Sequence, residues 1–233
     1  MTSFTIFGTG NMGSAIGGVL AAGGSDVTHV GHADAGTAPL TGDIVILAVP
    51  YPAVEGILAA YGEQLTGKIV VDITNPLNFE TFDSLVVPVG SSAAALIAAK
   101  LPGSTVLKAF NTNFAATLAS KQLGGLTTTV LIAGDDADAK SALAAAVTAG
   151  GIAAIDAGSL ARAHELEALG FLQLALAVGE KISWTGGFAV ANYRHTEEQH
   201  TPGGAARPHP APTVGHAVTI ALPELSLEEL IAR

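Results

Sequence analysis

The stretch FTIFGTGNMGSAIGGVL, residues 4–20, places a glycine-rich turn between an apolar strand and a helix of small residues. Gly8, Gly10 and Gly13 have the spacing G-x-G-x-x-G, follow the strand FTIF directly and open the helical pattern NMGSAIGGVLAA. Because the chain contains 28 glycines, this spacing alone is weak. Its position between a strand and a helix makes it more specific.

Each glycine in this turn has a physical role if a dinucleotide binds there. Glycine permits a tight turn, lets the backbone approach a pyrophosphate and allows close packing of helix on strand. The free N–H groups and the partial positive charge of the helix start then favour phosphate. We therefore expect Gly8, Thr9, Gly10, Asn11, Met12 and Gly13 to bind a dinucleotide. A glycine turn without a ligand is the alternative.

Composition limits the class of protein. Hydrophobic residues make up 49% of the 233, charged residues 13%, and the formal net charge is -10. This charge argues against nucleic acid or an anionic membrane as a partner, because binding phosphates requires Lys and Arg. No uncharged apolar run reaches the roughly 18 residues of a membrane helix, and Met1-Thr2-Ser3-Phe4 is not a basic signal start. We expect a soluble, cytoplasmic protein without disulfides, since the chain has no cysteine.

Apolar strands alternate with helical patterns along most of the chain. The strands are expected at about 3–7, 26–31, 43–49, 67–73, 104–109, 127–133 and 152–156. The helices are expected near 11–22, 52–65, 91–101, 112–121, 136–149 and 159–182. Continuously apolar runs such as DIVILAV are typical of parallel strands covered on both faces. The pattern predicts an α/β protein with a Rossmann-type, doubly wound, mainly parallel sheet. Only HADAGTAPLTG joins the second and third strands, so a trimmed loop replaces a crossover helix there.

The end of the chain divides into a long helix and a tail. The helix over 160–182 becomes apolar on all sides, which predicts that a second subunit covers it in a homodimer. Residues 193–216 are rich in Pro and His, and Ser226 and Glu229 form a capping-box pattern for a short final helix. We therefore expect a dinucleotide-binding domain over 1–192 and a flexible tail over 193–233. The tail histidines lack regular ligand spacing, so no metal site is predicted.

Polar residues follow three of the central strands, where ligands of such sheets bind. The candidates for the nicotinamide or a second substrate are Val49, Pro50, Tyr51, Asn75, Pro76 and Asn111. Asn78 is a weaker candidate. For the asparagines, a turn or helix-cap role is the alternative, and for Tyr51 ordinary packing is.

The residues after the second strand decide between the two forms of a nicotinamide dinucleotide. An acid there accepts from the ribose 2′-OH of NAD, whereas Arg holds the 2′-phosphate of NADP. The chain has Gly31-His32-Ala33-Asp34, with neither group in the usual place. His32 could contact a phosphate and Asp34 a hydroxyl, or both could lie in a solvated loop. The choice stays open.

Other polar residues have simpler interpretations. Asp72 and Lys108 lie within apolar strands and are expected to pair with each other or to lie near a ligand. Asp156 and Ser159 are expected to cap the last helix. His164 and Glu165 are expected on a solvated or interface face of that helix.

Motifs along residues 3–192 resemble the NADPH-dependent F420 reductase family. They are GTGNMG, ILAVPY, KIVVDITNPLN, VLKAFNT, IAGDD, DAGSLARAHELEALG and WTGGFA, in the family's order. The resemblance implies hydride exchange between NADP and coenzyme F420, a deazaflavin. The oxidoreductase domain of the STEAP ferric reductases is a further relative. The family commonly carries Ser-Arg where this chain has His32-Ala33, so the resemblance carries NADP preference less securely.

The residues offer no acid–base pair for carbonyl reduction. None of Tyr51, Tyr61 and Tyr193 has a lysine four residues later. Hydride transfer between nicotinamide and a flavin-like ring needs no such proton donor. We therefore predict an NAD(P)-dependent oxidoreductase, with NADPH favoured over NADH and F420 or a flavin as partner, and no catalytic side chain. The alternatives are a non-catalytic dinucleotide sensor and a pyrroline-5-carboxylate reductase, which would need a long helical domain after the sheet.

Overall fold

The computed structural model describes residues 2–34 and 36–191. The predicted tail over 193–233, its capping box and its histidines lie outside these residues. The boundary predicted at residue 192 therefore stays a prediction.

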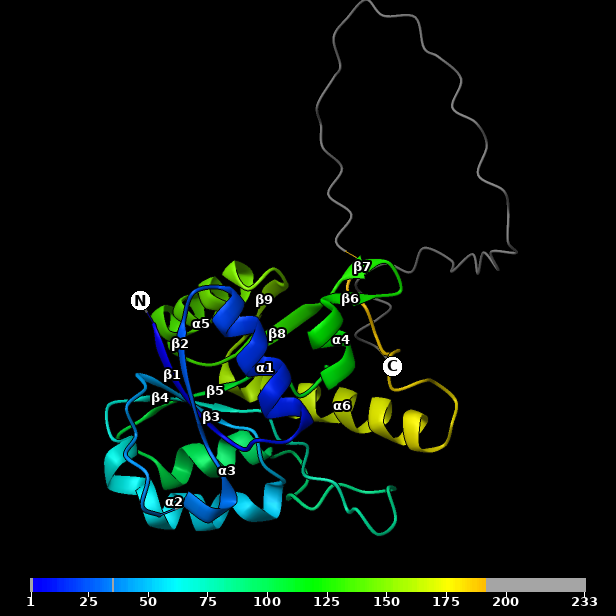
Figure 1. The fold of residues 1–233 in the computed structure, drawn as a ribbon. Helices are drawn as coiled ribbons and strands as arrows, with labels where there is room; N and C mark the ends of the chain where they lie inside the picture. Colours follow the sequence, from blue (N-terminus) through cyan, green and yellow to red (C-terminus); the bar gives the residue numbers. More distant parts are fainter. Residues whose placement is uncertain (1, 35, 192–233) are drawn as a thin grey trace, which may run out of the picture. The chain divides into compact units, whose positions relative to one another are not determined.

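A seven-stranded sheet in the order β2-β1-β3-β4-β5-β8-β9 forms the centre of the described chain (Figure 1). Its strands are β1 (Ser3–Phe7), β2 (Asp26–Val30), β3 (Ile44–Leu47), β4 (Ile69–Asp72), β5 (Thr105–Lys108), β8 (Thr129–Ala133) and β9 (Ala153–Gly158). The first five run parallel, β8 pairs antiparallel with β5, and β9 runs parallel to β8.

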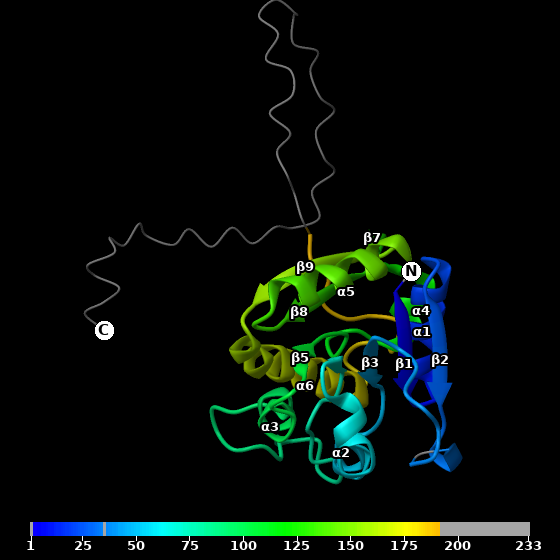
Figure 2. The same cartoon turned by 90° about the vertical axis from the view of Figure 1, so that its left-hand side faces the viewer.

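Helices cover both faces of this sheet (Figures 1 and 2). α1 (Asn11–Ala22), α4 (Ala115–Ser120) and α5 (Ala137–Ala149) pack on one face, and α2 (Tyr51–Leu65) and α3 (Ala93–Lys100) on the other. Each face of the sheet packs against its helices in a separate hydrophobic core. Along β3, Ile44 and Ile46 belong to the core with α1, and Val45 and Leu47 belong to the core with α2. Burial on both faces explains the unbroken apolar strands.

The sheet reverses direction after β5, and a short connection explains why. A parallel neighbour requires a crossover that returns to the start of the sheet. The six residues of α4 span only about 9 Å, and the hairpin of β6 (Gln122–Leu123) and β7 (Leu126–Thr127) follows them. The chain therefore enters β8 from the carboxyl end of β5 and runs antiparallel to it.

The chain changes direction of winding between β1 and β3. After β2 at the edge of the sheet, it crosses back to place β3 on the other side of β1. In the described residues of this connection, 31–34 and 36–43, the structure has just the short 3-10 helix η1 (His32–Asp34), as the trimmed-loop prediction requires. Such a switch point opens a crevice at the carboxyl ends of the two strands.

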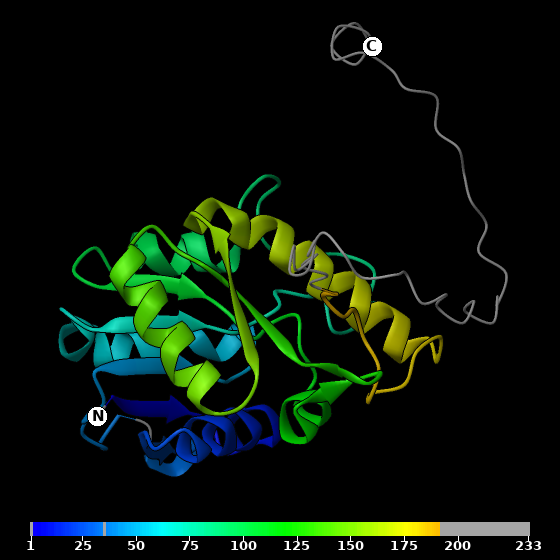
Figure 3. The same ribbon diagram turned by 90° about the horizontal axis from the view of Figure 1, so that it is seen from above.

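The last helix, α6 (Ala163–Val178), follows the 3-10 helix η2 (Leu160–Arg162) and is the long yellow helix of Figure 3. The predicted Rossmann-type, mainly parallel sheet is confirmed, and each predicted strand and helix is present with shifts of a few residues at its ends. Within the described residues, no helix combines the length and hydrophobicity that crossing a membrane requires.

Candidate functional site

A cavity of about 580 Å³ lies at the carboxyl ends of the central strands. The start of α1 and the residues after β3, β4 and β5 form its walls, and Leu174 of α6 and Trp184 add to them. Its position follows from the topology, because parallel strands end together at the switch point. It is large enough for a nicotinamide and a second ring system, since pockets for drug-sized ligands begin near about 300 Å³.

The glycine turn fits a pyrophosphate by its shape. Gly8 has a φ of +115°, and a Cβ there would collide with the carbonyl oxygen of Ala48. A Cβ on Gly13 would collide with the carbonyl oxygen of Gly8. Gly10 differs, because a Cβ there would meet no atom within 4 Å, and the residue lines the cavity. No side chain caps α1, so its first N–H groups are available to a phosphate.

Two asparagines clasp each other at the ends of β4 and β5. Asn75 Nδ2 donates to Asn111 O at 2.8 Å, and Asn111 Nδ2 donates to Asn75 Oδ1 at 3.0 Å and to Leu166 O of α6 at 2.8 Å. Phe110 adopts a left-handed φ of 62° immediately before Asn111. Gly170 lets α6 pack against this pair, because a Cβ there would lie 2.9 Å from Asn111 O.

Three polar atoms of the cavity residues have no partner within the described chain. They are Thr74 Oγ1, Asn111 Oδ1 and Asn113 Oδ1, and they are the buried side-chain atoms that lack one there. A buried polar group without a hydrogen bond costs about 1–3 kcal/mol. All three residues line the cavity, so a ligand with amide or hydroxyl groups has complementary atoms to meet.

A buried charge cluster lies behind this wall. Lys108 Nζ is 2.7 Å from Asp72 Oδ2 and 2.8 Å from Glu167 Oε1, and it donates to the carbonyl oxygen of Thr74. The three charged side chains are at most 1% exposed. Glu167 also accepts from the backbone N–H groups of Ala93 at 2.9 Å and Ala94 at 3.3 Å, at the start of α3. The cluster thereby ties α6 and α3 to the strand ends under the cavity.

Burial perturbs the acidity of groups near this cluster. Desolvation raises the pKa of Glu167, although Lys108 opposes the rise. Desolvation also raises the pKa of Tyr51, and the carboxylates of Asp72 and Glu167 add to it. The Tyr51 side chain is therefore a neutral phenol at pH 7, which can donate its O–H in a hydrogen bond but does not supply a phenolate.

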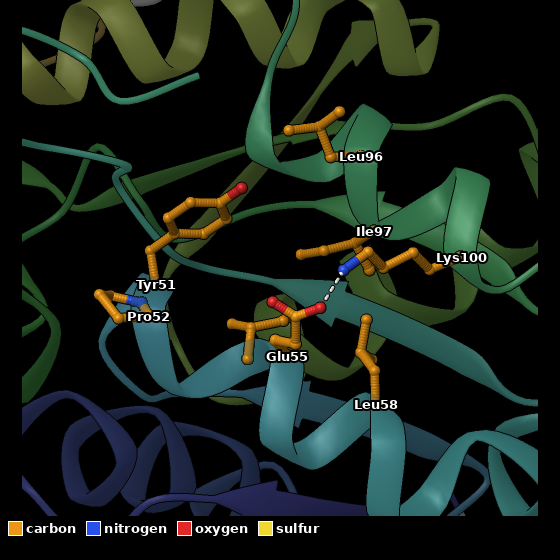
Figure 4. A pocket seen from close by; sticks show the side chains of 8 residues that line it. Tyr51, Pro52, Glu55, Leu58, Leu96, Ile97 and Lys100 are labelled. Atoms are coloured by element: carbon orange, nitrogen blue, oxygen red, sulfur yellow. Dashed lines mark hydrogen bonds and ion pairs between the residues drawn. The ribbon is translucent and has the colours of Figure 1, made fainter. Parts of the chain in front are cut away.

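Tyr51 separates the cavity from a smaller hollow of about 110 Å³ between α2 and α3. Figure 4 shows its ring extending from the start of α2 toward Leu96, with the Glu55–Lys100 ion pair at the other side of the hollow. The ring contributes to the walls of both spaces. Tyr51 is half-buried and packs against the core under α2 and α3.

The structure places eight of the thirteen predicted binding residues in the cavity wall. They are Gly10, Asn11, Met12, Val49, Pro50, Tyr51, Asn75 and Asn111. Gly8 and Gly13 shape the turn, Thr9 is exposed beside them, and Pro76 is buried and does not line the cavity. His32 lies in η1, exposed and apart from the cavity wall.

The expectation that Asp156 and Ser159 cap the last helix is wrong. Asp156 Oδ1 accepts from the N–H of Gly158 and from Lys140 Nζ, both at 2.8 Å. Ser159 precedes η2 but makes no side-chain capping bond. The 3-10 helix η2 separates both residues from α6, and the Asp156 side chain instead holds the end of β9.

The other two expectations hold. Asp72 and Lys108 pair as predicted. His164 and Glu165 are exposed: His164 Nδ1 lies 3.0 Å from Ser91 O, and Glu165 pairs with Arg162 at 2.7 Å.

Several cavity residues were not predicted. Thr74, Phe79, Asn113, Phe114, Leu174 and Trp184 line it as well. Trp184 packs on Phe114 with ring centroids 5.1 Å apart. Gln173 fixes the segment that follows α6, because it donates to Thr112 O at 3.2 Å and accepts from Phe188 N at 3.0 Å. The available sequence signal was that Glu167 and Gln173 lie among the apolar residues of the buried face of α6, where a polar side chain requires a partner.

Comparison with known proteins agrees with these features. A family model described as NADP oxidoreductase, coenzyme F420-dependent, matches residues 29–76. An F420-dependent NADP reductase of Methanocaldococcus jannaschii is 32% identical over 149 residues, which cover 62% of this chain and 66% of that protein. Metalloreductase STEAP3 of Rattus norvegicus is 38% identical over 112 residues, 48% of this chain and 22% of that protein. The chain thus matches less than two thirds of either curated relative.

A solved structure shows that the similarity extends to the fold. A candidate F420-dependent NADP reductase from Arthrobacter sp. FB24 aligns with a TM-score of 0.70 and 24% identity, over 82% of this chain and all of that one. The resemblance that the strand-end motifs predict is therefore confirmed: the chain is similar to the F420-dependent NADP oxidoreductases, in sequence to the archaeal enzyme and in fold to the Arthrobacter protein.

Proposed function

We propose that this protein is an oxidoreductase that transfers hydride between a nicotinamide dinucleotide and a flavin-like partner such as F420. The observation that carries the proposal is the single cavity that joins the open glycine turn to the Asn75–Asn111 clasp. The similar proteins support it, since NADP and F420 are named for them.

The chain's residues would act by binding and alignment. The N–H groups at the start of α1 hold the pyrophosphate, with Gly10 leaving room for it. Thr74, Asn111 and Asn113 supply hydrogen bonds to the carboxamide or to the second ring. When bound, the nicotinamide supplies the hydride chemistry.

The aromatic residues and α6 would complete the alignment. Tyr51 and the Phe114–Trp184 pair offer flat apolar surfaces for ring stacking and exclude water between the reactants. Holding two rings in a fixed geometry contributes several kcal/mol to such a reaction, up to about 7–11 kcal/mol in favourable cases. No side chain is required to move a proton.

The test is a turnover assay with the purified full chain. NADPH or NADH is mixed with F420, FMN or FAD, and loss of the reduced-nicotinamide absorbance is followed. We expect oxidation that depends on both reactants. Asn111→Ala should slow it, whereas Asn78→Ala serves as control, because Asn78 accepts local N–H bonds from Glu80 and Thr81 and lies outside the cavity wall. Dinucleotide binding without turnover of any acceptor would contradict the proposal.

We also propose that a second copy of the chain covers the outer face of α6. The helix buries Ala163, Leu166, Gly170 and Ala177, while Leu172 remains 51% exposed and Val178 42% exposed. Light scattering should give a dimer, and Leu172→Lys should shift it to monomer. Leu126→Lys, on the β6–β7 hairpin at 42% exposure, should not. A monomeric wild-type protein would contradict the proposal. We propose a cytoplasmic location as well, because the proposed reaction uses a nicotinamide dinucleotide.

A further inference from the structure

Charge is distributed unevenly around the end of β2, where Rossmann folds place the adenosine ribose. Residues 1–67 contain no Lys and no Arg. They include β2, its sheet neighbour β1, and α1, which packs beside β2, as well as β3 and α2. The first lysine, Lys68, bonds Gly42 O before β3, at the opposite end of the sheet.

Asp34 lies close to the glycine turn. Its Oδ2 is 3.5 Å from the position of a Cβ on Gly31, the residue directly after β2. The methyl group of Thr9 is 3.8 Å from the same position. The carboxylate therefore lies beside the end of β2 and the turn between β1 and α1. Asp34 follows the end of β2 by four residues, later than the usual acid at the strand end, but its carboxylate reaches back to Gly31, the residue directly after β2.

A buried tyrosine fixes the loop that carries this carboxylate. Tyr61 of α2 is 1% exposed, donates to Asp34 O at 3.3 Å and accepts from Gly36 N at 2.8 Å. The backbone of Asp34 also accepts from Thr37 N and Ala38 N at 3.1 and 3.0 Å. These bonds, which come from described residues, involve only the backbone of Asp34, and its side chain is exposed, so none of them occupies the carboxylate.

We propose that Asp34 sets the dinucleotide selectivity of this site and favours NAD(H) over NADP(H). This inference rests on the proposed dinucleotide site and departs from the NADP named for the similar proteins. The ionised carboxylate accepts hydrogen bonds from the ribose hydroxyls of NAD(H). A 2′-phosphate adds up to two negative charges beside it and finds no Lys or Arg among residues 1–67. NADP(H) still binds through its pyrophosphate and nicotinamide, but more weakly.

The test compares the dissociation constants of NAD⁺ and NADP⁺ by isothermal titration calorimetry with the full chain. We expect NAD⁺ to bind the wild type at least about tenfold more tightly, since a hydrogen bond to a charged group contributes about 1.5–3 kcal/mol. Asp34→Asn should reduce this ratio at least about fivefold, because it removes the repulsion and weakens the acceptor. Raising the salt concentration should also narrow the wild-type ratio, since salt screens the repulsion.

Asp26→Asn is the matched control. Asp26 begins the same strand at its other end, is exposed, and carries the same charge, so its loss should leave the ratio unchanged. Tighter binding of NADP⁺ by the wild type, or an unchanged ratio in Asp34→Asn, would overturn the inference while leaving the proposed function intact. The expected ratio without turnover of any acceptor would refute only the proposed function. Binding of neither dinucleotide would refute both.

Discussion

Replacing Lys108 by Met tests whether the buried cluster behind the cavity holds the site together. The substitution keeps an unbranched apolar stem but removes the ammonium group that contacts Asp72 and Glu167, at 2.7 and 2.8 Å. Both carboxylates are then left buried without that partner. Breaking a buried ion pair by removing one partner costs about 3–5 kcal/mol. For a domain of this size the midpoint of thermal unfolding should fall by roughly 10 °C.

Equilibrium unfolding in urea, followed by far-ultraviolet circular dichroism, measures this loss. Lys100→Met is the matched control, because Lys100 pairs with Glu55 on the surface and is 53% exposed. Its stability should be close to that of the wild type, since exposed pairs contribute little. The defect of Lys108→Met should also shrink at acidic pH, where the carboxylates become neutral. Equal stability of the two variants, or a defect that does not change with pH, would refute the reasoning.

Three further predictions concern the same wall. Burial raises the pKa of Glu167 above 4.5, so the stability that this shift contributes is complete below that pH and is lost as the pH rises through the folded-state pKa. Urea unfolding at several pH values should therefore show the free energy of unfolding of Glu167→Gln rising relative to that of the wild type above about pH 4.5. A difference that stays constant with pH would contradict this. Gly170→Ala should weaken nicotinamide binding in a fluorescence titration, because its Cβ would press on the Asn75–Asn111 clasp; unchanged affinity would show that α6 does not shape the site. Gly13→Ala should lower the free energy of unfolding by about 1–3 kcal/mol, whereas Gly10→Ala, with open space at its Cβ, should leave stability unchanged and weaken only dinucleotide binding; equal losses of stability would contradict the assigned roles.

The fold could be predicted because its strands are buried on both faces. Runs such as IVIL in β3 are apolar without interruption, and glycine or polar residues mark their ends. The antiparallel direction of β8 could not be predicted in this way. It depends on a six-residue helix and a hairpin with two-residue strands, which are too short to give a periodic signal.

The site was predicted where it follows directly from strand ends. Tyr51, Asn75 and Asn111 come after apolar strands, and all three line the cavity. Trp184 follows α6 and lines the same cavity. It lies so far along the sequence from the strand ends that no local sequence pattern indicates the contact. Glu167 gave a weak signal, since a charge on the inward face of an apolar helix requires a buried partner. Its partner, Lys108, lies on a different element and is revealed only by the packing of α6 on β5.

The most direct test of the central claim is a crystal structure of the protein with a bound dinucleotide, NAD⁺ in one crystal and NADP⁺ in another. Our account predicts the pyrophosphate against Gly10 at the start of α1. It places the nicotinamide in the cavity between Tyr51 and Asn111. A dinucleotide bound elsewhere, or a glycine turn without ligand at saturating concentration, would contradict the account.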